Sequence, residues 1–361
     1  MKLRVGIVGA SADGSWGSRA HIPALRSLPG FEVAGVATTR LETAQRAAEA
    51  LGIPRAFENS AQLAEDPGID VVAVCVRVPF HAKVIEAAIA ARKHIYCEWP
   101  LTVTTAEAQS ALEAAERSDG NTAVGLQGRA DPAVRMAKRL IDEGAIGAIH
   151  AVALNYSSAW PVTVPSQHML MQDAQSGLSQ LELSGGHCLD ALCYMLGEFK
   201  ELSATLATHV PQARVFDTGE VVTRTSADQM VVQGTLATGV TLSAHIMGAP
   251  GAGTGTRIEI QGTEGCLLLS SASRNVVPSA GLSLSRFAKG RTEPVDIAPE
   301  CIAAPERPSG DAANVANMYA LFEAAIAEGK PFQHGFGAAV TRHRMLDAIR
   351  QSAVSGTRVM L

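Results

Sequence analysis

Short apolar segments alternate with helical segments through the first 125 residues, and no other feature constrains the fold as strongly. The apolar segments, rich in β-branched residues, lie at Leu3–Val8, Phe31–Ala37, Asp70–Val76, His94–Cys97 and Thr122–Leu126. Segments rich in Ala, Glu and Leu separate them, at Leu41–Leu51, Phe80–Ala91 and Thr104–Ser118. Nearly continuous apolar strands joined by helices are typical of a parallel sheet covered on both faces. We therefore predict an α/β domain with a doubly wound parallel sheet of the Rossmann type over residues 1–126.

A different pattern follows in residues 127–361. Helices are predicted at Ala133–Glu143, Gly186–Leu196, Ala312–Glu328 and Gly337–Ser355. Strands are predicted at His150–Tyr156, Leu202–His209, Gln229–Leu236, Val240–Ile246, Arg257–Gln261 and Cys266–Ser270. The short turns at 237–239 and 263–265 end in glycine, as antiparallel hairpins prefer. We predict an α+β domain with a large, mainly antiparallel, open-faced sheet, and helices within 312–355 are candidates to pack back on the first domain.

The composition narrows the class of protein. Hydrophobic residues make up 47% of the 361 residues and charged residues 18%, which excludes an intrinsically disordered chain. The net charge of −5, without a dense Lys/Arg stripe, argues against a nucleic-acid partner. No apolar run approaches the roughly 18–20 residues of a membrane span, and the apolar run in MKLRVGIVGAS is too short for a secretory signal.

The cysteines form no CxxC pair and are dispersed through apolar stretches, at Cys75, Cys97, Cys188, Cys193, Cys266 and Cys301. This usage indicates free thiols in a reducing compartment. No His/Cys set has the spacing of metal ligands, so we predict no metal. We expect a cytoplasmic protein that binds neither nucleic acid nor membrane.

A glycine-rich turn follows the first predicted strand and precedes a helix. The residues that we expect to approach a dinucleotide are Gly9, Ser11, Gly14, Ser15 and Trp16. Glycines at such a turn let backbone amides reach a pyrophosphate. Ser11 stands where GxGxxG has its second glycine, and the turn is a few residues longer. The alternative is a purely structural turn.

The end of the second predicted strand indicates which dinucleotide is bound. An NAD-binding domain usually has an acidic residue there, which accepts hydrogen bonds from the ribose. This chain instead has Thr38, Thr39 and Arg40, with no carboxylate before Glu42. Hydroxyls and a guanidinium suit a 2′-phosphate, so we predict NADP rather than NAD, unless Arg40 simply faces solvent.

Further candidates follow the later strands of the first domain, whose carboxyl ends face the ligand crevice of a doubly wound sheet. Glu98 and Trp99 follow strand five, and the Trp99-Pro100 bond is a candidate for the cis form. Arg77 and His81 follow strand four and are candidates for the cofactor site, with a salt bridge and a helix cap as alternatives. Gln127 and Arg129 follow strand six and are candidates to hold substrate or the loop that carries Trp99.

In the second domain, His187 and Asp190 lie three residues apart on one predicted helix. That spacing would let the carboxylate orient the imidazole for acid/base work. Tyr156 and Trp160, at and after the first strand of this domain, are candidates to contact substrate.

The segments GIVGAS, EWPL, LQGRADP, LIDEGAIGAIHAV, GGHCLD, RIEIQGTEGCLLL and AIRQSAVSGTRV together resemble the Gfo/Idh/MocA oxidoreductase family over essentially the whole chain. The resemblance implies an NADP-dependent oxidoreductase acting on a sugar, polyol or related hydroxy compound. It also implies a homodimer or homotetramer formed through the open-faced sheet. His187 matches the family's catalytic or substrate-binding histidine.

Two positions depart from the family pattern. Trp99 stands where the EKP motif has a lysine that relays a proton, and an indole cannot do this. Leu183 stands where the family tends to have an aspartate, and the adjacent Glu182 is out of phase on a regular helix.

SWGSRAHIPAL, EWPL and LQGR are also similar to the branch that contains the fungal galactose-pathway repressor, in which Trp16 and Trp99 match aromatic positions. This resemblance implies an alternative function: a non-catalytic, NADP-binding regulator or sensor with a protein partner. Packing alone is a further explanation for the three tryptophans. The sequence leaves open the substrate and its stereochemistry, the direction of the reaction, and the choice between dimer and tetramer.

Overall fold

The structure is a computed structural model that describes residues 2–159, 163–249, 253–273, 275–279 and 281–361. The chain divides into two compact units. Unit 1 comprises residues 1–130 and 303–341, and unit 2 comprises residues 131–302 and 342–361. The two units are described separately below.

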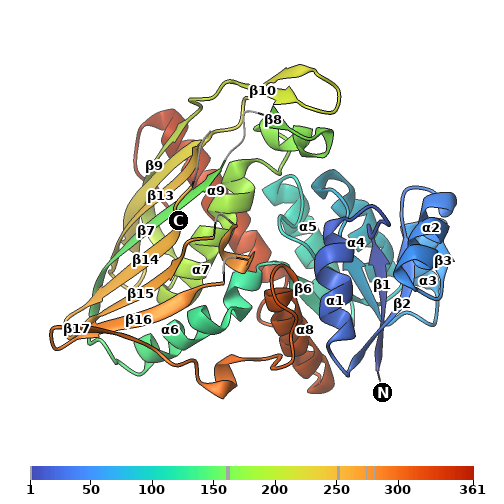
Figure 1. Cartoon of the computed structure of the whole chain (residues 1–361), viewed down its shortest axis with the longest axis horizontal. Coiled ribbons are helices and arrows are strands. Elements are labelled where there is room, and N and C mark those ends of the chain that lie inside the picture. The colour runs from blue at the N-terminus through green and yellow to red at the C-terminus, as the bar shows by residue number, and fades with distance from the viewer. Residues whose placement is uncertain (1, 160–162, 250–252, 274, 280) are drawn as a thin grey trace. The chain divides into compact units, whose positions relative to one another are not determined.

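The described part of unit 1 contains a six-stranded sheet in the order β3-β2-β1-β4-β5-β6, in which every neighbouring pair is parallel (Figure 1). Its strands are β1 (Leu3–Val8), β2 (Phe31–Ala37), β3 (Ala56–Phe57), β4 (Val71–Val74), β5 (His94–Cys97) and β6 (Thr122–Val124). The strand order reverses between β1 and β4, and ligands of such sheets bind at the carboxyl ends of the strands at that point. The predicted doubly wound parallel sheet is confirmed.

The helices of unit 1 follow from local sequence signals. At α5 the Thr104 side chain accepts from the amide of Glu107 while the Glu107 side chain accepts from the amide of Thr104, which forms a capping box. Gly52 ends α2 in the left-handed conformation, with φ 62°. The helical segments of this unit are η1 (Gly17–His21), α1 (Ile22–Arg26), α2 (Leu41–Leu51), α3 (Ser60–Glu65), η2 (Val78–Phe80), α4 (His81–Ala90), α5 (Thr105–Glu116), η3 (Gln127–Ala130) and α8 (Ala312–Ala327).

Helix α8 contributes to the core of unit 1 although it lies about 200 residues after β6 in the chain. Its buried residues Val315, Met318, Tyr319 and Phe322 pack in one apolar cluster with residues of β1, β4 and α1. The parallel sheet is therefore covered in part by a segment from the far end of the chain.

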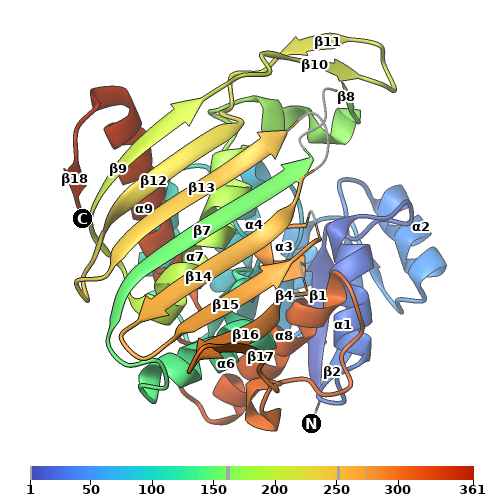
Figure 2. The same cartoon turned by 60° about the vertical axis from the view of Figure 1, so that its left-hand side comes forward.

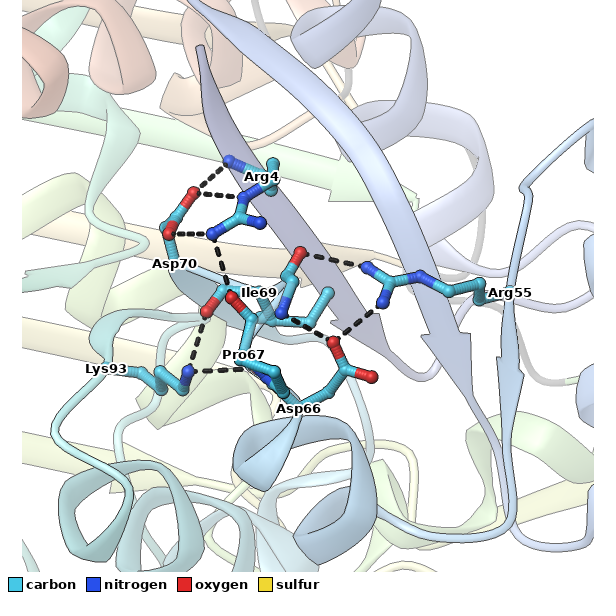
Figure 3. Close-up of polar contacts among 8 residues, drawn as sticks. Arg4, Arg55, Asp66, Pro67, Ile69, Asp70 and Lys93 are labelled. Carbon is cyan, nitrogen blue, oxygen red and sulfur yellow. Dashed lines mark hydrogen bonds and ion pairs between the residues drawn. The ribbon is translucent and has the colours of Figure 1, made fainter. Parts of the chain in front are cut away.

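A polar cluster ties together the loops at the amino ends of β1, β4 and β5 (Figure 3). The Arg4 guanidinium donates to both carboxylate oxygens of Asp70, at 2.8 and 2.9 Å. Arg55 donates to Asp66 at 2.7 Å, and Lys93 donates to the carbonyl oxygens of residues 66 and 69. This edge is opposite to the carboxyl ends of the strands, so the cluster stabilises the sheet and lies away from the expected ligand site.

Unit 2 contains a nine-stranded sheet within its described residues, in the order β17-β16-β15-β14-β7-β13-β12-β9-β18. Only the β13–β7 pair in this order is parallel. The predicted hairpins at 237–239 and 263–265 are confirmed, because β12 pairs antiparallel with β13 and β14 with β15. Helices α6 (Pro132–Asp142), α7 (Gly186–Leu196) and α9 (Phe336–Ser355) lie behind one face of the sheet, and Figure 2 shows the other face turned to the viewer.

The strands of the large sheet are β7 (Ile149–Ala159), β9 (Phe199–Ala207), β12 (Gln229–Leu236), β13 (Thr241–Ala249), β14 (Gly255–Gly262), β15 (Cys266–Ser271), β16 (Ser283–Ala288), β17 (Arg291–Pro294) and β18 (Val359–Met360). A separate three-stranded sheet has the order β11-β10-β8 and comprises β8 (Thr163–Val164), β10 (Gln212–Val215) and β11 (Val221–Thr223). Short helical segments of unit 2 are η4 (Ser166–Gln172), η5 (Leu181–Gly185), η6 (Val277–Ser279) and η7 (Pro299–Cys301). The predicted α+β class with a mainly antiparallel sheet is confirmed.

Candidate functional site

The glycine-rich turn of unit 1 joins the carboxyl ends of three neighbouring strands. Gly9 has φ 109°, and a Cβ atom there would lie 2.6 Å from the carbonyl oxygen of Cys75. Its amide donates to the carbonyl of Ala37 at 2.9 Å, at the end of β2. Only glycine permits this close approach. Gly14 has φ 89° and open space where a Cβ would stand, so the outer part of the turn leaves its backbone accessible.

Serine hydroxyls order this turn from within. Ser15 Oγ donates to the carbonyl of Gly9 at 2.8 Å and accepts from the amide of Ser11 at 3.0 Å. Ser18 Oγ donates to the carbonyl of Ser11. Trp16 is partly buried and packs against the apolar core of unit 1. Ser11 and Ser15 thus lie together in the turn, and the bonds of their side chains and amides shape its backbone.

The end of β2 forms a second ordered turn. The hydroxyls of Thr38 and Thr43 both lie within hydrogen-bond distance of the Arg40 carbonyl, at 3.0 and 2.8 Å. Thr39 and Arg40 are exposed. Arg46, which no sequence pattern singled out, lies in α2, and its guanidinium forms an ion pair with Asp13 of the glycine-rich turn. The glycine-rich turn is therefore linked to the end of β2 by the Gly9 amide and to α2 by this ion pair.

Glu98, at the end of β5, is held by two side chains of unit 1. His21 Nε2 lies 2.8 Å from Glu98 Oε1, and Gln127 Nε2 donates to both carboxylate oxygens at 2.8 and 3.1 Å. His21 Nδ1 lies 2.8 Å from the hydroxyl of Tyr319. A Cβ at Gly125 would lie 2.8 Å from the Glu98 carboxylate, so glycine there makes room for it.

This arrangement is a hydrogen-bonded chain from Tyr319 through His21 to Glu98. In the neutral tautomer that donates from Nε2, His21 accepts from Tyr319 at Nδ1 and donates to the carboxylate. The predicted residues Glu98 and Gln127 are brought together, whereas His21 and Tyr319 were missed. His21 stands in the AHIPAL segment, but Tyr319 lies 298 residues away and has no signal in the sequence.

Three other predicted residues of unit 1 are more enclosed than the sequence indicated. Both ring nitrogens of His81 face carbonyl oxygens, those of Leu101 at 3.1 Å and Val76 at 3.0 Å. Burial lowers the pKa of His81, although its bonds to carbonyls oppose this shift. Trp99 is buried, and its bond to Pro100 is cis. Arg129 is also buried, whereas Arg77 is exposed. Because His81 bonds with the carbonyl of Leu101, two residues after Trp99, it helps to position the segment that carries Trp99.

In unit 2, His187 lies in the first turn of α7 and is buried. The five residues before this helix, Leu181–Gly185, form a π-helix, a feature that is frequent at functional sites. Asp190 Oδ1 accepts from Arg342 Nε at 3.0 Å, and both side chains are fully enclosed. Arg342 also donates to Glu198 at 2.8 and 3.0 Å. Arg342, which the sequence did not single out, thus connects Asp190 to α9.

Glu182 lies in the irregular helix, where neighbouring side chains hold its carboxylate. Its buried carboxylate accepts from the amide and hydroxyl of Ser179 and from Arg350. The Tyr156 hydroxyl bonds with the side chains of Ser158 and Ser184, and burial raises its pKa. Trp160 lies outside the described residues.

Among the described residues, no group of three or more His, Cys, Asp or Glu side chains is arranged to hold a metal ion. The cysteines predicted to be free thiols are all free. No helix in the described ranges is long and apolar enough to cross a membrane.

Family comparisons match two parts of the chain. Residues 3–126 match the Gfo/Idh/MocA model, described as an oxidoreductase family with an NAD-binding Rossmann fold. Residues 132–271 match a model of the Gal80p-like C-terminal domain.

Three similar proteins represent both functional alternatives. The dehydrogenase aclE of Aspergillus oryzae is 33% identical over 60% of this chain and 61% of its own length. The galactose/lactose metabolism regulatory protein GAL80 of Kluyveromyces lactis is 28% identical over 73% of this chain and 63% of its own length. The match therefore spans less than two thirds of either relative. A structure of levoglucosan dehydrogenase, in complex with NADH and levoglucosan, superimposes with a TM-score of 0.86 at 25% identity and covers 100% of this chain and 99% of that one.

Proposed function

Because the chain combines the nucleotide-binding domain of the Gfo/Idh/MocA oxidoreductase family with a Gal80p-like second domain, we propose that it is an NADP-dependent oxidoreductase acting on a sugar, polyol or related hydroxy compound. The observation that carries this proposal is the Gly9 turn at the β1/β4 switch point, where doubly wound sheets bind dinucleotides. The buried histidine of α7 supplies the acid/base group that such a reaction needs.

The residues of unit 1 fit a dinucleotide. The close contact of Gly9 with the end of β4 and the open space at Gly14 leave backbone accessible where a pyrophosphate would approach. Glu98, aligned by His21 and Gln127, would face the nicotinamide end, since β5 lies on the other side of β4 from the turn. The dinucleotide, when bound, supplies the hydride acceptor or donor.

NADP is favoured by the end of β2. Thr39 and Arg40 are exposed there, and no carboxylate lies between the end of β2 and Glu42 to repel a 2′-phosphate. Arg46 adds a second guanidinium close to the turn, although Asp13 partly neutralises it.

In this proposal, the group that accepts and returns the substrate's hydroxyl proton lies in unit 2. His187 accepts the proton of the substrate hydroxyl at an imidazole nitrogen as hydride leaves the same carbon, and returns it in the reverse reaction. The paired Asp190 holds its helix to α9 through Arg342, so Asp190 acts as a positioning residue. Tyr156, Gln127, Arg129 and Trp99 are the proposed substrate contacts, and the buried Tyr156 hydroxyl stays protonated, able to donate to a substrate oxygen.

The second candidate function is a non-catalytic, dinucleotide-binding regulator with a protein partner. The match of residues 132–271 to the Gal80p-like domain favours it, as do Trp99 and Leu183 in place of a lysine and an aspartate. The open face of the nine-stranded sheet is our proposed surface for a homodimer or homotetramer under either function.

The test is nicotinamide reduction, followed by absorbance, with NADP⁺ and a panel of sugars and polyols. We expect turnover with at least one compound, a fall in kcat of about 10²–10⁴-fold in His187→Asn, and no change in the control His150→Asn, whose side chain is exposed. Tight NADP⁺ binding without turnover across the panel would refute the enzyme, and a gain of activity in Trp99→Lys would then support the regulator.

A further inference from the structure

Unit 2 contains a buried glutamine whose side-chain amide makes no hydrogen bond to any part of the chain that the structure describes. Gln180 is 1% exposed, and both Oε1 and Nε2 are buried. The polar neighbours in sequence are all paired: Ser179 bonds with Glu182, and Glu182 also bonds with Arg350. Buried polar groups are nearly always hydrogen-bonded, because an unpaired donor or acceptor loses its hydration without replacement. An amide that is unpaired at both ends therefore requires an explanation.

The position of Gln180 supplies one. Gln180 directly precedes the π-helix η5, which continues without a break into α7. Residues 184 and 187 therefore follow residue 180 by four and seven positions in one helical run. Residues 180 and 184 lie within one wider turn of the π-helix, and residues 184 and 187 lie within one turn where it passes into α7, so the three lie toward one side of the run. Ser184 is buried and bonds with the Tyr156 hydroxyl, and His187 is the proposed acid/base. Gln180, Ser184, Tyr156 and His187 form what we call the polar row of unit 2.

We propose that Gln180 is a specificity-determining residue that binds two neighbouring hydroxyls of the substrate. This inference rests on the proposed oxidoreductase function and names the substrate more closely as a vicinal diol. A side-chain amide presents an acceptor and a donor side by side in one plane. One hydroxyl of a vicinal diol donates to Oε1 and its neighbour accepts from Nε2. A carboxylate would pair only with Nε2, and an apolar ligand with neither atom.

The first experiment measures the stability of the protein without substrate. Gln180→Met keeps the length of the side chain and removes the two unpaired polar groups. We expect the melting temperature to rise by about 2–8 °C, since an unsatisfied buried group is costly and a unit of this size responds by a few degrees. The matched control is Gln172→Met, because Gln172 is equally buried but accepts from Arg224 at 2.7 Å and donates to the His168 carbonyl at 3.1 Å. The control should lower the melting temperature.

The second experiment measures KM with NADP⁺ saturating. For a polyol that the native protein oxidises, Gln180→Met should raise KM about 5- to 100-fold, the loss expected for two hydrogen bonds. With a deoxy analogue that lacks one hydroxyl of the pair, the ratio of the variant's KM to the native KM should fall.

Each result decides the proposal. If Gln180→Met is no more stable than the native protein, or if its KM is unchanged for every substrate, Gln180 is not the diol-binding residue, while the oxidoreductase function stands. If the native protein oxidises no compound in the panel, the proposed function fails, and the diol assignment fails with it.

Discussion

Arg342 should be a highly sensitive charged position of unit 2. It is fully buried on α9 and bonds with two carboxylates of very different exposure. The Asp190 side chain is 1% exposed, whereas that of Glu198 is 44% exposed. Arg342→Met keeps most of the side-chain volume but leaves the Asp190 carboxylate buried without its cation. Breaking a buried pair in this way costs about 3–5 kcal/mol, while losing a solvent-exposed partner costs about 0–1 kcal/mol.

Thermal unfolding followed by calorimetry separates the two contributions. For a unit of this size about 1 kcal/mol corresponds to 2–4 °C, so Arg342→Met should lower the melting temperature of unit 2 by about 6–20 °C. Glu198→Gln should lower it by no more than about 4 °C. The double variant Arg342→Met/Asp190→Asn should recover part of the loss, because the buried carboxylate charge is removed with its cation. Equal effects of Glu198→Gln and Arg342→Met would refute the reasoning, since burial would then not decide the strength of these pairs.

Two further predictions concern unit 1. Asp70→Asn should lower the free energy of unfolding by about 1–2 kcal/mol at pH 7, because its bonds with the half-exposed Arg4 are partly screened. The hydrogen bond from Arg4 lowers the pKa of Asp70 below its ordinary value of 3.8, so this stabilisation is present above about pH 4 and is lost as pH falls through the folded-state pKa. The free energies of unfolding of the native protein and Asp70→Asn, measured from pH 3 to 7, should converge as the pH falls. The control is Asp119→Asn, whose side chain is exposed. A difference between native protein and Asp70→Asn that stays constant with pH would contradict the linkage. Thr38→Asp should shift the ratio of dissociation constants toward NAD⁺ by repelling a 2′-phosphate. Thr38→Val should not, because it removes the bonds to the Arg40 carbonyl and the Thr43 hydroxyl without adding a charge. Unchanged NADP⁺ affinity in Thr38→Asp would remove the basis for predicting NADP.

The sequence predicted the regular elements well where one physical signal dominates. Leu3–Val8, Phe31–Ala37, Leu41–Leu51 and Gly186–Leu196 have the predicted bounds, because continuous apolar runs or clear helical periodicity mark them. The strands at Ser283–Ala288 and Arg291–Pro294 were missed. They lie at an edge of the sheet, where half-exposed residues leave little apolar pattern to detect.

The candidate site was predictable only where its residues follow a strand or match a motif. Gly9 and Glu98 were found in this way. The supporting contacts were not predictable, because their partners lie far apart in the sequence. His21 and Tyr319 are 298 residues apart, and Asp190 and Arg342 are 152 residues apart. The π-helix before His187 was also unpredictable, because an i→i+5 turn has no composition of its own.

The energetics of the polar row bear on the choice between enzyme and regulator. A protein that only binds a dinucleotide and presents a surface to a partner needs the residues of unit 1 and the exterior of unit 2. It gains nothing from an amide buried in unit 2 with neither end hydrogen-bonded among the described residues. Natural proteins lie just above the stability that they need, and they retain destabilising groups chiefly where function uses them. Gln180 therefore favours a small polar ligand in unit 2, which an oxidoreductase needs and a regulator without a small-molecule ligand does not.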